Sequence, residues 1–108
     1  MKIMTLQKVA KRCMPSNSKA SGDRMWTWDR RGGYAGERSI STTLQRAKEL
    51  GFQEQPSVDW STTPDGSVSR RGTYLFHANG MLLYASAKYG AVAADNCFNI
   101  ELHAPRRS

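Results

Sequence analysis

The sequence predicts one small α+β domain in which two N-terminal helices, joined by a long basic loop, precede an antiparallel sheet of about four strands. Two amphipathic stretches with the helical 3.6-residue period lie in the first half of the chain. Alternating apolar residues and turn signals dominate the second half. Helices that cover one face of an antiparallel sheet form the α+β arrangement. A chain of 108 residues suffices for one such core and is too short for two ordinary domains.

The single domain, residues 1–108, divides by composition into three parts. We expect a basic helix and loop over 1–38, a helix followed by the antiparallel sheet over 39–104, and a short basic tail over 105–108.

The first helix is predicted over residues 5–14. Thr5 is a candidate N-cap, and Pro15 ends the helix. Apolar residues recur on one side and basic residues on the other: Ile3, Leu6, Val9, Ala10, Cys13 and Met14 against Lys2, Lys8, Lys11 and Arg12. The apolar side packs on the core. The basic side is either solvated or free to contact nucleic acid or a membrane surface.

Residues 15–37 show no sustained period and are rich in glycine, serine, arginine and aromatic residues. We interpret them as a long loop with at most one strand, at 25–29. The second helix then begins with Ser39 or Ser41 as N-cap and ends at Gly51. Its apolar side carries Ile40, Leu44 and Ala47.

The sheet is predicted from strands at 58–62, 67–78, 81–86 and 97–103. A turn at 63–66 joins the first two, and Asn79-Gly80 predicts a type I′ hairpin turn, which sets Ala78 opposite Met81. In that register one sheet face carries Tyr74, Phe76, Met81, Leu83 and Ala85, and we expect it to face the core. The solvent face then carries Thr73, Leu75, His77, Leu82, Tyr84 and Ser86.

Charge is distributed unevenly along the chain. Sixteen Lys and Arg against nine Asp and Glu give a formal net charge of +7. Residues 1–48 hold eleven of the basic residues and three of the acidic ones, whereas residues 49–108 hold five and six. A basic half joined to a near-neutral half predicts a polyanionic partner, although a basic stretch can also serve solubility alone.

Several classes of function lack support in the sequence. Two cysteines do not form a secreted disulfide framework, and the two histidines have no metal-ligand spacing to either cysteine. We find no phosphate-binding loop, nucleophile elbow or cofactor motif, and no apolar run long enough for a membrane span. We therefore expect a cytoplasmic protein with no cofactor and no metal. An acid-free start with five basic residues among the first 22 is also typical of an organellar transit peptide.

The leading hypothesis is a small, non-enzymatic nucleic-acid-binding protein that prefers RNA or single-stranded DNA. Tryptophan and tyrosine rings stack on unpaired bases, arginine pairs with phosphate, and glycines allow close backbone approach. The segment 25–34 combines all three. The predicted contacts are Lys8, Lys11, Arg12, Arg24, Trp26, Trp28, Arg30, Arg31, Tyr34 and Arg38. The alternative for the two tryptophans is an edge strand that seals the core.

Two other hypotheses stay open. In the first, the protein is a metal-independent, toxin-like ribonuclease in which histidine acts as acid or base. Its residues would be His77, His103, Arg71, Lys88 and Tyr84. In the second, the protein is an inhibitor or accessory subunit of the phage or mobile-element type, and its exposed aromatic residues anchor an acidic protein partner.

Overall fold

The computed structural model describes residues 5–55, 59–62 and 69–105, and over 59–62 and 69–71 it describes the backbone alone. The elements follow in the order α1 (Leu6–Cys13), β1 (Lys19–Ala20), β2 (Met25–Arg31), α2 (Ala35–Glu49), β3 (Gln53–Glu54), β4 (Asp59–Thr62), β5 (Ser69–Phe76), β6 (Leu82–Tyr89), the 3₁₀ turn η1 (Ala93–Asp95) and β7 (Cys97–His103).

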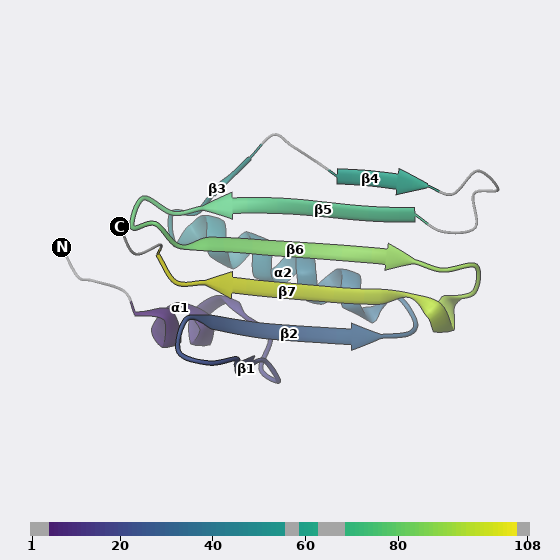
Figure 1. The fold of residues 1–108 in the computed structure, drawn as a ribbon, viewed down its shortest axis with the longest axis horizontal. Helices are drawn as coiled ribbons and strands as arrows, with labels where there is room; N and C mark the ends of the chain where they lie inside the picture. Colours follow the sequence, from purple (N-terminus) through teal and green to yellow (C-terminus); the bar gives the residue numbers. More distant parts are fainter. Residues whose placement is uncertain (1–4, 56–58, 63–68, 106–108) are drawn as a thin grey trace.

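The strands of the described residues form one antiparallel sheet of seven. Their order is β1-β2-β7-β6-β5-β3, and β4 pairs with the other end of β5. Figure 1 shows the sheet with α2 running behind it, roughly along the strands. The first and second helices pack against each other, and α1 also contacts β2 and β7. One face of the sheet is therefore covered by helices, and the other is not.

The predicted arrangement of two helices, a long basic loop and then about four strands is wrong. The presumed loop contains β1 and β2, and β3 follows α2 directly, so the sheet has more strands than expected. All seven residues of β2 pair with β7, the last strand of the chain. Since this partner is distant in the sequence, nothing local to residues 25–31 indicates the pairing.

The first helix was predicted correctly, and the start of the second was not. Thr5 caps α1 as expected, because its hydroxyl oxygen accepts the backbone N–H of Lys8 at 3.2 Å. In contrast, α2 begins at Ala35, ahead of both candidate serine caps. Its N-cap residue, Tyr34, makes no side-chain capping bond. Gly33 precedes it with φ of 68°, so a glycine turn rather than a serine cap leads into the helix.

The hairpin between β5 and β6 differs from the predicted one by a single residue. A type I′ turn needs positive φ at both central residues. Among the described residues only glycines have positive φ, and Gly80 is one of them while Asn79 is not. The N–H groups of His77 and Gly80 instead bond to the carbonyls of Met81 and His77, which closes a three-residue loop.

This one-residue slip reverses the faces of β5. Leu75 pairs with Leu83 and both are fully buried, whereas Tyr74 pairs with Tyr84 on the opposite face. The prediction for Met81, Leu83 and Ala85 was correct, and that for Tyr74 and Phe76 was wrong.

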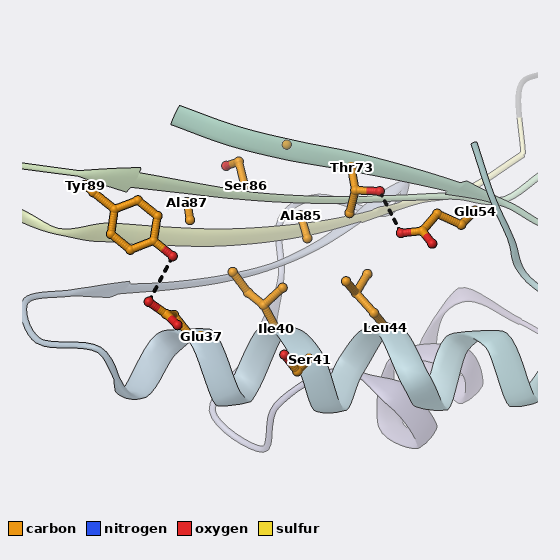
Figure 2. A pocket seen from close by; sticks show the side chains of 11 residues that line it. Glu37, Ile40, Ser41, Leu44, Glu54, Thr73, Ala85, Ser86, Ala87 and Tyr89 are labelled. Carbon is orange, nitrogen blue, oxygen red and sulfur yellow. Dashed lines mark hydrogen bonds between the residues drawn. The ribbon is translucent and has the colours of Figure 1, made fainter. Parts of the chain in front are cut away.

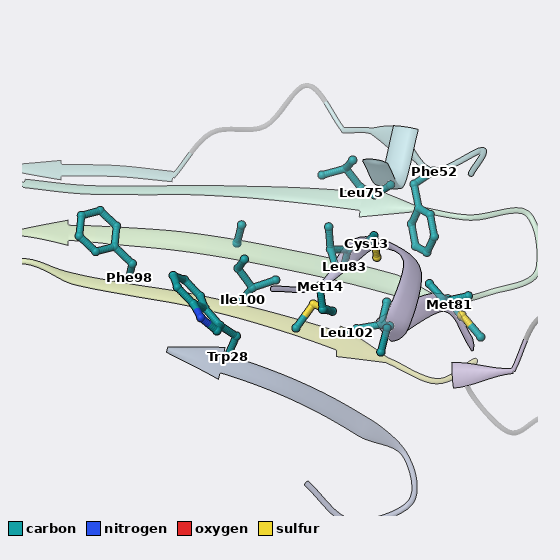
Figure 3. Close-up of a cluster of buried hydrophobic side chains, with 14 of the residues drawn as sticks. Cys13, Met14, Trp28, Phe52, Leu75, Met81, Leu83, Phe98, Ile100 and Leu102 are labelled. Carbon is teal, nitrogen blue, oxygen red and sulfur yellow. The ribbon is translucent and has the colours of Figure 1, made fainter. Parts of the chain in front are cut away.

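The core lies between the helices and the covered face of the sheet (Figure 3). It contains Val9, Ala10, Cys13, Met14, Trp28, Ala47, Phe52, Leu75, Met81, Leu83, Ala85, Ala87, Phe98, Ile100 and Leu102. At Gly36, α2 packs directly on the sheet, because an added Cβ would lie 2.3 Å from ring atoms of Phe98. Neither helix of the described residues combines the length and apolar character that a membrane span requires.

Candidate nucleic-acid interface

The sheet face turned away from the helices is called here the open face. Its residues alternate in sequence with the buried ones, and the register places them side by side across four strands. They are Met25, Thr27, Asp29 and Arg31 of β2, Cys97, Asn99, Glu101 and His103 of β7, Leu82, Tyr84, Ser86 and Lys88 of β6, and Gly72, Tyr74 and Phe76 of β5. Apart from Gly72, which the Tyr84 ring covers, none of these residues is buried by the described part of the chain, so the face is accessible.

Aromatic rings gather on the open face over β5 and β6. Tyr74 and Tyr84 lie directly opposite each other, with ring centroids 4.6 Å apart and planes inclined by 35°. We call them the tyrosine pair. Tyr74 is 37% exposed, and Phe76, two residues further along β5, is 45% exposed. Exposed aromatic rings in a row across a sheet form a surface on which other planar groups can stack.

Gly72 allows the Tyr84 ring to lean across β5. A Cβ at this position would lie 3.1 Å from the Tyr84 hydroxyl oxygen and 3.4 Å from the nearest ring carbon. Glycine inside a strand weakens the strand and often marks a close approach by another group. Here the approaching group is the ring itself, so Gly72 fixes where the tyrosine pair lies.

Four residues beyond Tyr84 along β6, the open face carries two cations. Arg31 and Lys88 both pair with Cys97 in the register, one from each side, and both are exposed. Neighbouring strands lie about 4.8 Å apart, so the two backbone positions are about 10 Å apart. Within the described part of the chain neither residue has a carboxylate partner. We call Arg31 and Lys88 the cation row, and the backbone register pairs Lys88 with a further basic residue, Arg70.

A row of polar side chains separates the tyrosine pair from the cation row. Asp29, Asn99 and Ser86 are neighbours in the register on β2, β7 and β6. The Asn99 amide donates to the Trp28 carbonyl at 3.2 Å, which leaves its side-chain oxygen as an acceptor. Among the described residues, the Asp29 carboxylate and the Ser86 hydroxyl have no hydrogen-bond partner. These three residues are the polar row.

The two tryptophans predicted to stack on bases lie on the covered face. Trp28 is 4% exposed and belongs to the core, opposite Ile100. Trp26 is half-buried against the same core, and its indole N–H donates to the Ser18 hydroxyl at 2.8 Å. Their alternation along β2 seals the core, although β2 is flanked by β1 and is not an edge strand. Neither ring is therefore placed to stack on a ligand at the open face.

The predicted basic contacts do not share one surface. Arg31 lies on the open face, whereas Arg30, the residue before it on β2, projects from the opposite side of the sheet. Lys8, Lys11 and Arg12 are exposed on α1, Arg38 is exposed on α2, and Tyr34, 62% exposed, precedes α2. Arg24 donates a hydrogen bond to the Pro105 carbonyl. One short ligand cannot touch both the helical side and the open face, so these residues do not form a single site.

The residues of the ribonuclease hypothesis are also separated. Tyr84, Lys88 and His103 lie on the open face. Arg71 instead occupies a backbone position opposite Ala87, which is buried on the covered side, so this position does not belong to the open face. His77 lies in the hairpin loop. Its Nδ1 accepts the Asn79 backbone N–H at 3.0 Å, so its Nε2 carries the hydrogen and donates to the Leu50 carbonyl at 2.9 Å. His77 thus ties the loop to the end of α2.

His103 is paired on the open face. Its Nε2 lies 2.9 Å from Oε1 of Glu101, and Glu101 is opposite Tyr84 in the register. The structure therefore brings His103 next to the tyrosine pair but leaves His77 out of this group.

A groove opens on the covered side, between α2 and the strands β5 and β6 (Figure 2). Its volume is about 140 Å³, below the range of about 300–1,000 Å³ typical of sites for small ligands. Its two carboxylates already have partners: Glu37 accepts from the Tyr89 hydroxyl at 3.0 Å, and Glu54 accepts from Thr73 and pairs with Lys48. The groove is therefore a weaker candidate than the open face.

The cysteines do not provide a better candidate site than the open face. Burial raises the pKa of the Cys13 thiol to about 11, an effect that the nearby Arg46 charge opposes only in part. A thiol with so high a pKa is unreactive at neutral pH. Within the described residues, no group of three or more His, Cys, Asp or Glu side chains is placed to hold a metal ion.

Sequence reasoning missed Tyr74 and Phe76 as surface residues. The signal was present in Gly72, a glycine inside a strand and close to a tyrosine in the next strand, but reading it requires the correct hairpin register. Comparison of the chain with models of known protein families, with curated protein sequences and with solved structures gave no match.

Proposed function

We propose that this protein binds single-stranded nucleic acid on the open face of its sheet. The observation that carries the proposal is the tyrosine pair, in which Tyr74 is exposed and Tyr84 half-buried. It lies on the same face of the sheet as Arg31 and Lys88, which have no carboxylate partner among the described residues. Bases stack on the rings, and the cations contact phosphates. The site differs from the one expected from sequence, since it keeps Arg31 and replaces the tryptophans with tyrosines.

Single strands fit this surface better than duplexes. Stacking needs an unpaired base whose ring face is free, and a regular duplex hides these faces inside the helix. Each base stacked on an aromatic side chain contributes about 1–3 kcal/mol, largely independent of sequence. The net charge of +7 adds long-range attraction to any polyanion and raises the rate of encounter. We therefore expect binding with little sequence preference and a strong dependence on salt.

The test is equilibrium binding of fluorescein-labelled single-stranded and duplex oligonucleotides, followed by fluorescence anisotropy at several salt concentrations. Wild-type protein should bind the single strand more tightly. Tyr84→Ala should weaken binding by about 1–3 kcal/mol, because one stacking contact is lost. Absence of binding at low salt, or tighter binding to the duplex, would overturn the proposal.

A matched pair of charge variants locates the phosphate contacts. The double variant Arg31→Ala, Lys88→Ala should reduce the slope of log K against log salt by about 1.4, since each single-strand phosphate contact contributes about 0.7. The control, Lys8→Ala with Lys11→Ala, removes the same charge from exposed positions on α1. Equal effects of the two variants, with no effect of Tyr84→Ala, would indicate attraction by net charge alone and would contradict binding at the open face.

A further inference from the structure

Three of the four parallel rows on the open face hold the tyrosine pair, the polar row and the cation row, and the proposed function assigns no contact to the polar row between the other two. Along β6, Tyr84, Ser86 and Lys88 lie two residues apart and project on the same side. Figure 2 shows Ser86 directed away from α2, while Ala85 and Ala87 point toward the helix. The steps between rows are about 6–7 Å. The open face thus presents aromatic, polar and cationic rows in that order.

The order of the rows matches the covalent order of a nucleotide, in which the sugar joins the base to the phosphate. A nucleotide whose base stacks on the tyrosine pair and whose backbone reaches toward Lys88 carries its sugar over the polar row. Ser86 and Asn99 are then the side chains nearest to its sugar, and Asp29, two strands from Ser86 and so about 10 Å away, faces the sugar of a neighbouring nucleotide.

The chemistry of the polar row favours a ligand that donates hydrogen bonds. The Asp29 carboxylate is an acceptor only and repels phosphate, and the free oxygen of Asn99 is also an acceptor. The Ser86 hydroxyl both donates and accepts. A ribose 2′-hydroxyl can donate and accept as well, and deoxyribose has no such group. With DNA bound, Asp29 and Ser86 would lose water without gaining a partner.

We propose that the polar row Asp29, Asn99 and Ser86 recognises the ribose 2′-hydroxyl, so that the ligand is single-stranded RNA rather than DNA. The inference rests on the proposed binding at the open face and adds the class of nucleic acid. It assigns Asp29 and Ser86 to hydrogen bonds that DNA cannot make.

The experiment compares RNA, DNA and 2′-O-methyl RNA of one sequence in the same anisotropy assay. Wild-type protein should bind RNA more tightly than DNA by about tenfold or more, the effect expected for a hydrogen bond to a charged group. The 2′-O-methyl strand should bind like DNA, because its oxygen can no longer donate to Asp29. Equal affinity for RNA and DNA would overturn the inference and leave the proposed function intact, whereas binding of neither strand would overturn both.

Variants assign the selectivity to the polar row. Ser86→Ala should weaken RNA binding by about threefold to tenfold, and Asp29→Ala by more. Neither variant should weaken DNA binding, and Asp29→Ala should strengthen it, because a carboxylate that repels phosphate is removed. The matched control is Ser41→Ala, which removes an exposed hydroxyl on α2 and should change neither affinity. Equal loss of RNA and DNA binding in Ser86→Ala would contradict the inference, since it would assign the residue to folding or to general contact.

Discussion

The Tyr84 ring lies across the backbone of Gly72 on the neighbouring strand, so that a Cβ at position 72 would come within 3.1 Å of the tyrosine hydroxyl oxygen. Gly72→Ala should therefore displace the ring and weaken binding of a single-stranded oligonucleotide. Stability should change by less than about 1 kcal/mol, because alanine is favoured over glycine in a strand and partly offsets the lost ring contact. Anisotropy and thermal denaturation measure the two effects separately.

A second substitution tests whether the contact with the hydroxyl causes the effect. Tyr84→Phe removes the atom nearest to the new Cβ, and the remaining ring carbons lie 3.4 Å and further from it. The double variant Gly72→Ala, Tyr84→Phe should regain most of the lost affinity. If it binds as poorly as Gly72→Ala, the account of Gly72 as the residue that positions the ring is wrong.

Gly36 determines how closely α2 packs on the sheet. A Cβ there would overlap the Phe98 ring, at 2.3 Å, and would also lie 2.8 Å from the Cβ of Phe98, which is 1% exposed. Gly36→Ala should destabilise the protein by about 1–3 kcal/mol or more, as overpacked cores do. Urea denaturation measures this, with Thr42→Ala, an exposed position on the same helix, as the control. A gain of about 1 kcal/mol, the usual effect of this exchange on an exposed helix, would contradict the packing.

Sequence patterns predicted the structure correctly where it depends on residues that are close together in the chain. The Thr5 cap and the strand at 97–103 were both predicted correctly, because a cap and a half-buried strand are set by residues a few positions apart. Pairing of β2 with β7 depends on the complementarity of Trp28 and Ile100, which are remote in sequence. No local pattern contains that information.

The candidate site was missed for a related reason. Asn79-Gly80 indicated a turn at the correct place, but the turn type, which φ at Asn79 decides, determines the register of the whole hairpin. With the register displaced by one residue, Tyr74 was assigned to the core and Leu75 to solvent. The tyrosine pair could not be recognised until the two strands were aligned correctly.

Asn96 holds together three segments at one end of the sheet. Its side chain is 1% exposed, donates to the Gly33 carbonyl at 2.9 Å and accepts the Gly90 N–H at 3.0 Å. Asn96→Ala should cost about 2–5 kcal/mol, because both backbone groups lose their partner in a poorly hydrated site. Thermal denaturation and faster amide exchange at Gly90 are the measurements. Wild-type stability in this variant would show that water replaces the amide without cost.

Cys13 makes stability depend on pH in the alkaline range. Its folded-state pKa of about 11 lies above the ordinary thiol pKa of 9.0, so folding favours the protonated thiol. The stabilisation is complete below pH 9 and is lost as pH rises from 9 through 11, because the unfolded chain ionises first. The difference between these two pKa values corresponds to at most about 3 kcal/mol of the free energy of unfolding. Between pH 8 and pH 10.5, urea denaturation should show a smaller loss of stability for Cys13→Ala than for wild type. Equal losses would contradict the attribution of this pH dependence to Cys13.

The location of the binding surface is tested most directly by NMR of the aromatic rings. Among the described rings, Tyr74 and Tyr84 lie on the open face, whereas Trp26 and Trp28 lie on the covered side. Protein labelled with ¹³C in these rings is titrated with a single-stranded RNA oligonucleotide. We predict large shifts for Tyr74 and Tyr84, from the ring currents of stacked bases, and small shifts for Trp26 and Trp28. Shifts confined to Trp26, Trp28 and Tyr34, or no shift in the tyrosine pair at saturating RNA, would contradict binding at the open face.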